Sequence, residues 1–313
     1  MHFTQKDILD MASLSAEEIT HILDTAQGMK EISLRPVKKV PTLRGKTLIL
    51  FFHEASTRTK TSFDIAGKRL SADVIALAKS GSSMAKGESL LDTVKTLEAM
   101  HPDVVVMRHG TSGAAQYIAG HLKSPVINAG DGKHAHPTQA LLDMMTIRER
   151  KGRLAGLKVA IIGDIAHSRV ARSNMEGLIR MGAEVRVAGP PTMIPKGVEE
   201  VYGVKVFSAV EGALEGADVV MMLRIQKERM ENILFASERE YARTFGLSTG
   251  RLALAHPDAL VLHPGPMNRG VEITDEVADG HHSVILDQVE NGVALRMALF
   301  YLLAGGMRHA DED

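Results

Sequence analysis

The chain contains neither cysteine nor tryptophan among its 313 residues. The absence of cysteine excludes disulfide bonds, thiolate metal sites and a cysteine nucleophile. The formal net charge of −1 gives no general attraction to nucleic acid or to a membrane surface. The most apolar late segment, 293–303, is too short to cross a bilayer and contains Arg296. The N-terminal segment has acidic residues and lacks the apolar centre of a secretory signal, so we expect a cytoplasmic protein.

Strand-like and helix-like patterns alternate along the whole chain. In the first half, strands are predicted at 47–52, 74–77, 103–107 and 126–128, with helices near 59–70, 88–100 and 113–122. In the second half, strands are predicted at 158–162, 184–188, 205–208, 219–223 and 260–262, with a helix at 173–181. Strands separated by helix-length segments are typical of parallel sheets with helical crossovers.

We therefore predict an α/β protein of two domains, each a parallel sheet flanked by helices. The charged run at 148–153 precedes a new strand and marks the boundary, which gives domains of 1–148 and 149–283. A helix from about Pro137 leads into this run, since proline fits the first helical position. The last helix, at 284–305, has a broad apolar face, and we expect it to pack back on the first domain.

Polar and cationic residues follow the predicted strands. Ser56-Thr57-Arg58-Thr59 lies at a strand-to-helix junction, where backbone N–H groups, the helix dipole, hydroxyls and a guanidinium suit a phosphate. An ordinary helix cap is the alternative, and His53 and Glu54 beside it are interpreted as structural. The other strand-end candidates are Arg108, the segment 164–169, Arg224 with Gln226, and His263-Pro264-Gly265-Pro266.

Open α/β sheets bind ligands at the carboxyl ends of their strands, so these segments are expected to form a site. Lys86 adds a further cation from a Gly- and Ser-rich loop. Arginine binds phosphates and carboxylates with two parallel hydrogen bonds, and this many cations at ligand positions predict strongly anionic substrates.

The order and spacing of these segments resemble the catalytic chains of the aspartate carbamoyltransferase family, nearly from end to end. The matching segments are Ser56–Thr59, Lys86-Gly87-Glu88, His136-Pro137-Thr138-Gln139, 163–169, 224–229 and 263–270. The resemblance implies that the first domain binds carbamoyl phosphate and the second binds aspartate. It implies transfer of the carbamoyl group to L-aspartate, giving N-carbamoyl-L-aspartate and phosphate, an early step of pyrimidine synthesis.

The resemblance also implies roles for individual residues. Those around carbamoyl phosphate are Ser56, Thr57, Arg58, Thr59, Ser82, Arg108, His136, Gln139, Gly265 and Pro266. Those around aspartate are Lys86, Arg169, Arg224 and Gln226. The residues expected to act in catalysis are Arg58, Thr59, His136 and Lys86, with His136 donating a hydrogen bond to the carbonyl oxygen. Carbamoyl phosphate is already activated, so positioning and charge stabilisation are sufficient and no cofactor is expected.

By the same resemblance the catalytic unit is a homotrimer with shared active sites, in which Ser82 and Lys86 come from the neighbouring chain. A regulatory chain or a dihydroorotase occurs with some relatives, and the residues do not indicate whether either associates here.

Alternatives to this function remain open. An ornithine carbamoyltransferase shares the first substrate, but that family typically has His-Cys-Leu-Pro in place of 263–266, and Arg224 would repel the ornithine ammonium. Enzymes for other amino acids are a further alternative. A non-catalytic homologue is the alternative from another class, and the intact set of arginines with His136 and Lys86 argues against it.

Metal and dinucleotide binding are not expected. His134 with His136, and His281 with His282, are spaced like metal ligands but lack a carboxylate or cysteine partner at metal-site spacing. Gly163-Asp164 follows a strand, but the Gly-x-Gly-x-x-Gly pattern of a dinucleotide site is missing.

Overall fold

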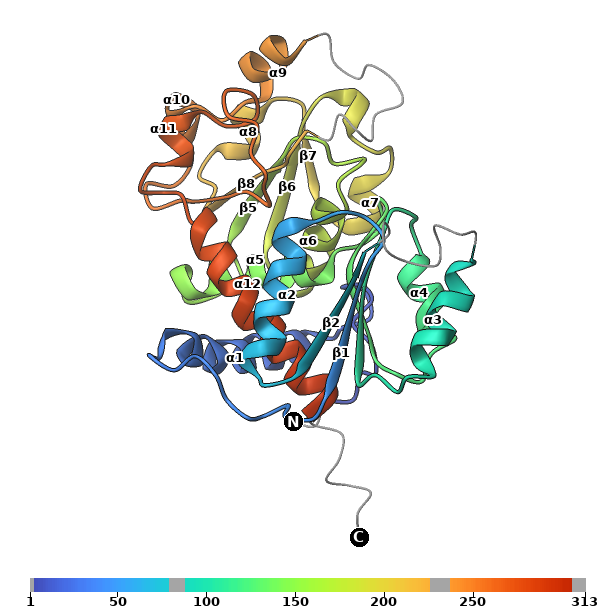
Figure 1. Cartoon of the computed structure of the whole chain (residues 1–313). Coiled ribbons are helices and arrows are strands. Elements are labelled where there is room, and N and C mark those ends of the chain that lie inside the picture. The colour runs from blue at the N-terminus through green and yellow to red at the C-terminus, as the bar shows by residue number, and fades with distance from the viewer. Residues whose placement is uncertain (1–2, 79–87, 226–236, 306–313) are drawn as a thin grey trace. The chain divides into compact units, whose positions relative to one another are not determined.

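The computed structural model describes residues 3–78, 88–225 and 237–305, and the chain divides into two compact units (Figure 1). One unit comprises Met1–Met145 with Glu290–Asp313, and the other comprises Thr146–Val289. The chain enters the second unit within helix α5 (Pro137–Lys151) and leaves it within helix α12 (Ile285–Phe300). The charged run at 148–153 therefore includes the last turn of α5.

The first unit is built on a four-stranded parallel sheet with the strand order β2-β1-β3-β4. Its strands are β1 (Thr47–Phe52), β2 (Asp73–Ala78), β3 (Val104–His109) and β4 (Val126–Asp131). The central strands read as continuous apolar runs because both of their faces are buried, which is the usual composition of a parallel sheet covered by helices.

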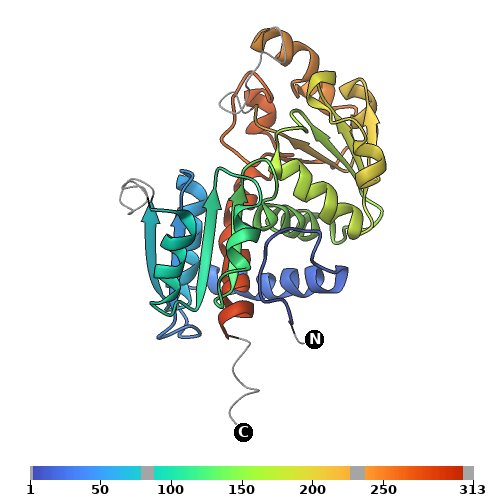
Figure 2. The same ribbon diagram turned by 90° about the vertical axis from the view of Figure 1, so that its right-hand side faces the viewer.

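Helices cover both faces of this sheet (Figure 2). The helices of the unit, besides α5 and α12, are α1 (Ala16–Leu34), α2 (Thr57–Arg69), α3 (Leu90–Glu98) and α4 (Ala114–Ala119). On one face, Phe51 and Met107 pack with Val94 of α3 and Ile118 of α4. On the other face, Gly67 of α2 approaches Leu48 so closely that an added Cβ would lie 2.9 Å from its Cδ1 atom.

The second half of α12 packs within the first unit, as predicted. The ring of Phe300 contacts Phe63 of α2 at a centroid distance of 5.6 Å in an edge-to-face arrangement. The Oγ atom of Ser33 on α1 lies 3.7 Å from the Sδ atom of Met297. A π-helical turn, Tyr301–Gly305, follows α12.

The second unit is built on a five-stranded parallel sheet with the order β7-β6-β5-β8-β9. Its strands are β5 (Lys158–Ile162), β6 (Glu184–Ala188), β7 (Lys205–Phe207), β8 (Val219–Met222) and β9 (Leu260–Leu262). Its helices are α6 (Arg169–Arg180), α7 (Val198–Tyr202), α8 (Val210–Leu214), α9 (Glu238–Phe245), α10 (Thr249–Leu252) and α11 (Asp275–Ala278), with a 3₁₀ turn at Pro191–Met193. Ile162, Met222 and Val261 pack with Leu214 of α8 in its core.

The predicted fold class is confirmed: two parallel sheets, each flanked by helices, with the last helix packed on the first unit. Some boundaries differ from the predictions. Strands β3 and β4 continue to His109 and Asp131, and α6 begins at Arg169 rather than Ser173, because the Ser168 hydroxyl caps it by accepting from the Ala171 N–H. Among the described residues, no helix is both long and apolar enough to span a membrane.

Candidate functional site

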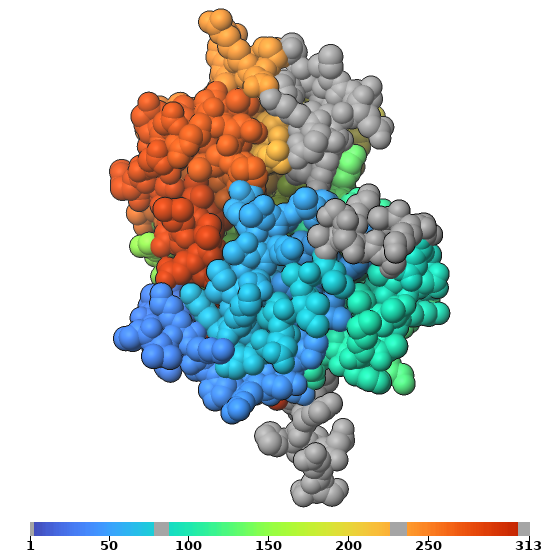
Figure 3. Space-filling view, viewed as in Figure 1, coloured from blue at the N-terminus to red at the C-terminus, as the bar shows by residue number. Residues whose placement is uncertain are grey.

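The segment Ser56–Thr59 forms the first turn of α2, which lies at the surface of the first unit (light blue in Figure 3). Ser56 occupies the N-cap position, but its side chain makes no capping hydrogen bond within the described chain. Thr57 and Arg58 are exposed, and Thr59 is half-buried. The Ser56 hydroxyl therefore accepts no hydrogen bond from the backbone N–H groups at the start of α2. Because this helix end is positively polarised, its N–H groups are suited to bind an anion.

Arg108 lies at the end of β3, opposite Phe52 of β1. Its Nη2 atom donates to Glu54 Oε1 at 2.7 Å, and its Nη1 atom donates to the Ala129 carbonyl at 3.0 Å. Its own carbonyl accepts from the backbone N–H groups of His53 and Glu54 at 2.9 and 3.3 Å. The loop that leads into α2 is thus tied to β3, and Glu54 orients the guanidinium by a charge-assisted bond.

His53 and His109 stack with their ring centroids 4.3 Å apart. His109 Nδ1 accepts from the Thr111 N–H at 3.0 Å, so that nitrogen is unprotonated and the imidazole is neutral. Burial, and then the nearby His53, lowers the pKa of His109. The neutral imidazole of His109 therefore stacks on the His53 ring beside the loop that leads into α2.

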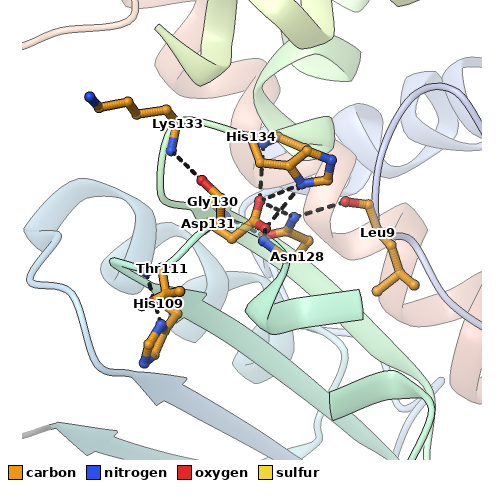
Figure 4. A network of polar contacts seen from close by, with 11 residues as sticks. Leu9, His109, Thr111, Asn128, Gly130, Asp131, Lys133 and His134 are labelled. Atoms are coloured by element: carbon orange, nitrogen blue, oxygen red, sulfur yellow. Dashed lines mark hydrogen bonds and ion pairs between the residues drawn. The ribbon is translucent and has the colours of Figure 1, made fainter. Parts of the chain in front are cut away.

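A network of polar contacts centred on Asp131 organises the end of β4 (Figure 4). The Asp131 carboxylate is only 1% exposed. It accepts hydrogen bonds from Gly113 N (2.6 Å), Asn128 Nδ2 (2.9 Å), Ala135 N (3.0 Å) and His134 Nδ1 (3.0 Å). One buried carboxylate therefore connects the β3–α4 loop, the end of β4 and the turn that leads to α5.

This turn places His136, which is 4% exposed, at the start of α5. The His136 carbonyl accepts from the N–H groups of Gln139 and Ala140 at 3.0 and 3.2 Å, and Pro137 is the first residue of the helix. Gly132 has a φ of +46°, and a Cβ there would lie 2.4 Å from the Ser112 nitrogen. The turn is thus held on both sides, which fixes the backbone from which the His136 side chain extends.

The strand order of the first sheet reverses between β1 and β3. The chain runs from β1 outward to β2 and then returns to place β3 and β4 on the other side of β1. Ligands of open α/β sheets bind at this kind of switch point, outside the carboxyl ends of the strands. Ser56–Thr59 and Arg108 follow or end the two strands that flank it.

The second sheet has the same feature between β5 and β8. Arg169 is the first residue of α6 after β5 and is 4% exposed, and Arg224 follows β8. The fully buried carboxylate of Asp164 accepts from the backbone N–H of His167 at 3.1 Å and contacts its Nδ1 atom at 2.9 Å. These bonds position the turn that carries Arg169.

The turn after β9 is fixed by a buried imidazole. His263 Nδ1 accepts from Gly265 N at 2.8 Å, so the proton lies on Nε2, which donates to Glu272 Oε1 at 3.2 Å. Glu272 also accepts from Asn268 N at 2.7 Å. The Gly265–Pro266 peptide bond within this turn is cis.

The predicted site residues thus fall at the carboxyl ends of the strands in each unit. The predicted roles of Ser82, Lys86 and Gln226 concern positions outside the described residues. Sequence reasoning treated Glu54 as structural and passed over Asp131 and Glu272, the carboxylates that hold the turns after β4 and β9. Among the described residues, no group of three or more His, Asp or Glu side chains is arranged to hold a metal ion.

Comparisons with known proteins identify the class of protein to which this chain belongs. Residues 6–149 match the carbamoyl-phosphate-binding domain of the aspartate/ornithine carbamoyltransferases, and residues 155–303 match their aspartate/ornithine-binding domain. A two-domain carbamoyltransferase is therefore the class that fold and domain order define. The chain belongs to the aspartate/ornithine carbamoyltransferase family.

Similar proteins are found at full length. The chain is 65% identical to the aspartate carbamoyltransferase catalytic subunit of Desulforapulum autotrophicum, covering 99% of both chains. It is also 65% identical to that of Desulfosudis oleivorans, covering 100% of both.

Solved structures of both branches of the family share the fold. Ornithine carbamoyltransferase from Pyrococcus furiosus has a TM-score of 0.88 at 31% identity, covering 98% of this chain and 100% of that one. Aspartate transcarbamoylase from Trypanosoma cruzi, in complex with N-(phosphonacetyl)-L-aspartic acid, has a TM-score of 0.86 at 29% identity, covering 95% of both.

Proposed function

We propose that the protein transfers the carbamoyl group of carbamoyl phosphate to the amino group of L-aspartate. The products are N-carbamoyl-L-aspartate and phosphate, and the reaction is an early step of pyrimidine synthesis. The observation that carries this proposal is the full-length identity of 65% to aspartate carbamoyltransferase catalytic subunits. The cationic residues at the switch points of both sheets support it.

The first unit is the proposed carbamoyl-phosphate site. The N–H groups of the first turn of α2, with the side chains of Ser56, Thr57, Arg58 and Thr59, bind the phosphate, and Arg108 adds a second guanidinium. His136 donates a hydrogen bond to the carbonyl oxygen, which becomes an oxyanion in the tetrahedral intermediate. Gln139 of this unit is proposed to contact the carbamoyl amine, and the backbone of Gly265 and Pro266, which belong to the second unit, is proposed to contact the same group.

The chemistry requires positioning rather than a covalent intermediate. The aspartate nitrogen forms a bond to the carbonyl carbon, and the bond from that carbon to the phosphate oxygen breaks. The departing phosphate accepts the amine proton. Arg58 and Thr59 contact both the leaving group and the carbonyl oxygen, so their hydrogen bonds become stronger as negative charge develops on these groups in the transition state.

The second unit is the proposed aspartate site. Arg169 and Arg224 bind the two carboxylates of aspartate, assisted by Gln226 and by Lys86. Because the Pyrococcus furiosus ornithine enzyme has the same fold, the choice between amino acids depends on side chains. A guanidinium at Arg224 attracts a side-chain carboxylate and repels the ammonium of ornithine.

A homotrimer with shared active sites, acting in the cytoplasm, completes the proposal. The edge strand β2 supports association, because Ile75 is 47% exposed and Val74 and Leu77 are only half-buried. Ser82 and Lys86 follow this strand and are proposed to act in the site of the neighbouring chain. Size measurement of the purified chain, alone and with a regulatory chain or a dihydroorotase, tests the assembly.

Turnover with carbamoyl phosphate and either aspartate or ornithine tests the reaction. We expect carbamoyl-aspartate to form and carbamoyl-ornithine not to form. Absence of carbamoyl-aspartate at saturating substrates would refute the proposal.

Two variants test the division of roles between the units. Arg58→Ala should reduce kcat by at least about a hundredfold, a loss typical of removing a transition-state donor. Arg224→Ala should mainly raise the KM for aspartate. The exposed Arg153 offers a control, since Arg153→Ala removes an arginine outside the site. Equal effects of Arg224→Ala on the KM values of both substrates would contradict its role.

A further inference from the structure

We propose that Asp143 is a positioning residue that orients the Gln139 amide and thereby selects a carbamoyl group over other acyl groups. The inference rests on the proposed function and adds a specificity determinant to it. It is carried by a buried hydrogen bond on α5 and by a buried guanidinium on α12, both within the first unit.

The first observation is the contact between the two side chains. Gln139 Nε2 donates to Asp143 Oδ1 at 2.8 Å, one helical turn along α5. Asp143 is fully buried, whereas Gln139 is half-buried near the His136 end of the helix. A buried carboxylate behind a partly exposed amide is the arrangement expected of a residue that fixes its neighbour from the protein interior.

The second observation is the charge that accompanies Asp143. Arg296 of α12 is 4% exposed and interacts electrostatically with the Asp143 carboxylate. Its Nη1 atom donates to Ser62 Oγ at 3.1 Å and to the Gly292 carbonyl at 2.8 Å, and the guanidinium lies 4.9 Å from the centre of the Phe63 ring. Burial lowers the pKa of Arg296 to about 10, and Asp143 opposes this change, so the guanidinium stays charged at neutral pH.

A charged guanidinium favours an ionised Asp143, because a buried charge is stabilised by an opposite one. An ionised carboxylate can only accept hydrogen bonds. The NH₂ end of the Gln139 amide must therefore face Asp143, and its oxygen faces the other way as a fixed acceptor. A protonated Asp143 would allow the reverse orientation.

This orientation matches the chemistry of the substrate. The carbamoyl group differs from an acetyl group by an NH₂ in place of a methyl, and only the NH₂ can donate to the amide oxygen. Sites built to hydrogen-bond a substrate N–H discriminate against the analogue that lacks it, since the polar group is then left without its partner.

The experiment compares carbamoyl phosphate with acetyl phosphate in the wild type and in Asp143→Asn. The asparagine amide can either donate or accept, so it no longer fixes the Gln139 amide. We expect the KM for carbamoyl phosphate at saturating aspartate to rise about tenfold, corresponding to one hydrogen bond. The inhibition constant of acetyl phosphate should stay within about twofold, because the methyl group makes no such bond.

The ratio of the KM for carbamoyl phosphate to the inhibition constant of acetyl phosphate separates a positioning role from a general structural effect. A general structural effect would weaken the binding of both ligands together. An unchanged ratio in Asp143→Asn would overturn the inference. In a Gln139→Ala background, Asp143→Asn should have no further effect on the ratio, and a full additional loss would also overturn it. Asp64→Asn, which changes a half-buried carboxylate of α2 paired with Lys68, is the control and should leave both constants unchanged.

The design remains informative if the single variant does not fold. The pair Asp143→Asn with Arg296→Met removes both buried charges, a replacement that proteins often tolerate, and predicts the same change in ratio. Failure of the wild type to form carbamoyl-aspartate would contradict the proposed function itself. Wild-type turnover with an unchanged ratio in the variants would contradict only the role of Asp143.

Discussion

Replacing Asp131 with asparagine tests whether one buried carboxylate holds the turn that carries His136. The two oxygens of Asp131 divide the four donors between them. Oδ1 accepts from Asn128 Nδ2 and Ala135 N, and Oδ2 accepts from Gly113 N and His134 Nδ1. An asparagine has one oxygen, so its NH₂ must face one of these pairs of donors whichever way it is oriented.

The least costly orientation directs the new NH₂ toward Gly113 and His134, because the imidazole can change tautomer and accept. The Gly113 N–H then loses a charge-assisted bond, worth about 1.5–3 kcal/mol, and a donor left without a partner adds about 1–3 kcal/mol. We expect Asp131→Asn to lower the free energy of unfolding by about 3 kcal/mol. We also expect a higher KM for carbamoyl phosphate, since the backbone before His136 is released.

Urea unfolding of both forms measures the loss, and Lys133→Ala provides the control. Lys133 lies in the same turn, but its side chain is exposed, so its removal should change stability by less than about 0.5 kcal/mol. An Asp131→Asn protein within about 1 kcal/mol of this control would refute the argument.

Four further substitutions give expectations of known sign. Glu54→Gln removes the carboxylate bonded to Arg108 and should raise the KM for carbamoyl phosphate about fivefold at saturating aspartate, whereas an unchanged KM would contradict the assigned role. Because the pKa of His109 is lowered in the folded protein, His109 of the unfolded chain takes up a proton first as the pH falls. The stability that His109 contributes is therefore present above its ordinary pKa of 6.5 and is lost as the pH falls below that value. In urea titrations, His109→Gln should therefore flatten the decline of stability below this pH, by at most about 1.4 kcal/mol per pH unit, and equal slopes would count against the argument. Gly292→Ala should lower the free energy of unfolding by about 1–3 kcal/mol, because a Cβ would lie 2.5 Å from the Nη1 atom of Arg296. Gly28→Ala has open space around the new Cβ and should raise the free energy of unfolding by up to about 1 kcal/mol. Changes of the same sign in the two variants, measured by thermal unfolding, would refute this contrast.

The strands were predictable because burial on both faces selects continuous apolar runs, such as 47–52 and 158–162. Helix α1 was missed although Ser15 and Glu18 form a capping box at its start, with Ser15 Oγ accepting from the Glu18 N–H and the Glu18 carboxylate accepting from the Ser15 N–H. The short helices α10 and α11 leave almost no periodic pattern, since each has only four residues. Local composition therefore indicated the apolar strands of both sheets better than it indicated helix α1 or the four-residue helices.

The cationic positions of the candidate site were predictable, whereas the carboxylates behind them were not. An arginine at a strand end has a local explanation, because strand ends of a parallel sheet meet at one edge. The partner of Arg108 is 54 residues away at Glu54, and no periodic pattern connects the two. Asp143 lies four residues from Gln139 on one helix, so helical spacing could have indicated that pair, whereas Asp131 also bonds Gly113, 18 residues away, which no local pattern indicates.

Buried and half-buried carboxylates compensate cationic side chains of the proposed carbamoyl-phosphate site before any substrate binds. Uncompensated guanidinium groups at the ends of neighbouring strands repel one another. Glu54 bonds the Arg108 guanidinium directly, while Asp143 offsets the buried charge of Arg296. Each carboxylate fixes a donor or an amide in one orientation and lowers the local positive charge, so substrate anions meet groups that are already oriented. This arrangement predicts that neutral variants at Glu54 and Asp143 affect ligand selectivity and affinity more than the chemical step, which single-turnover and KM measurements can separate.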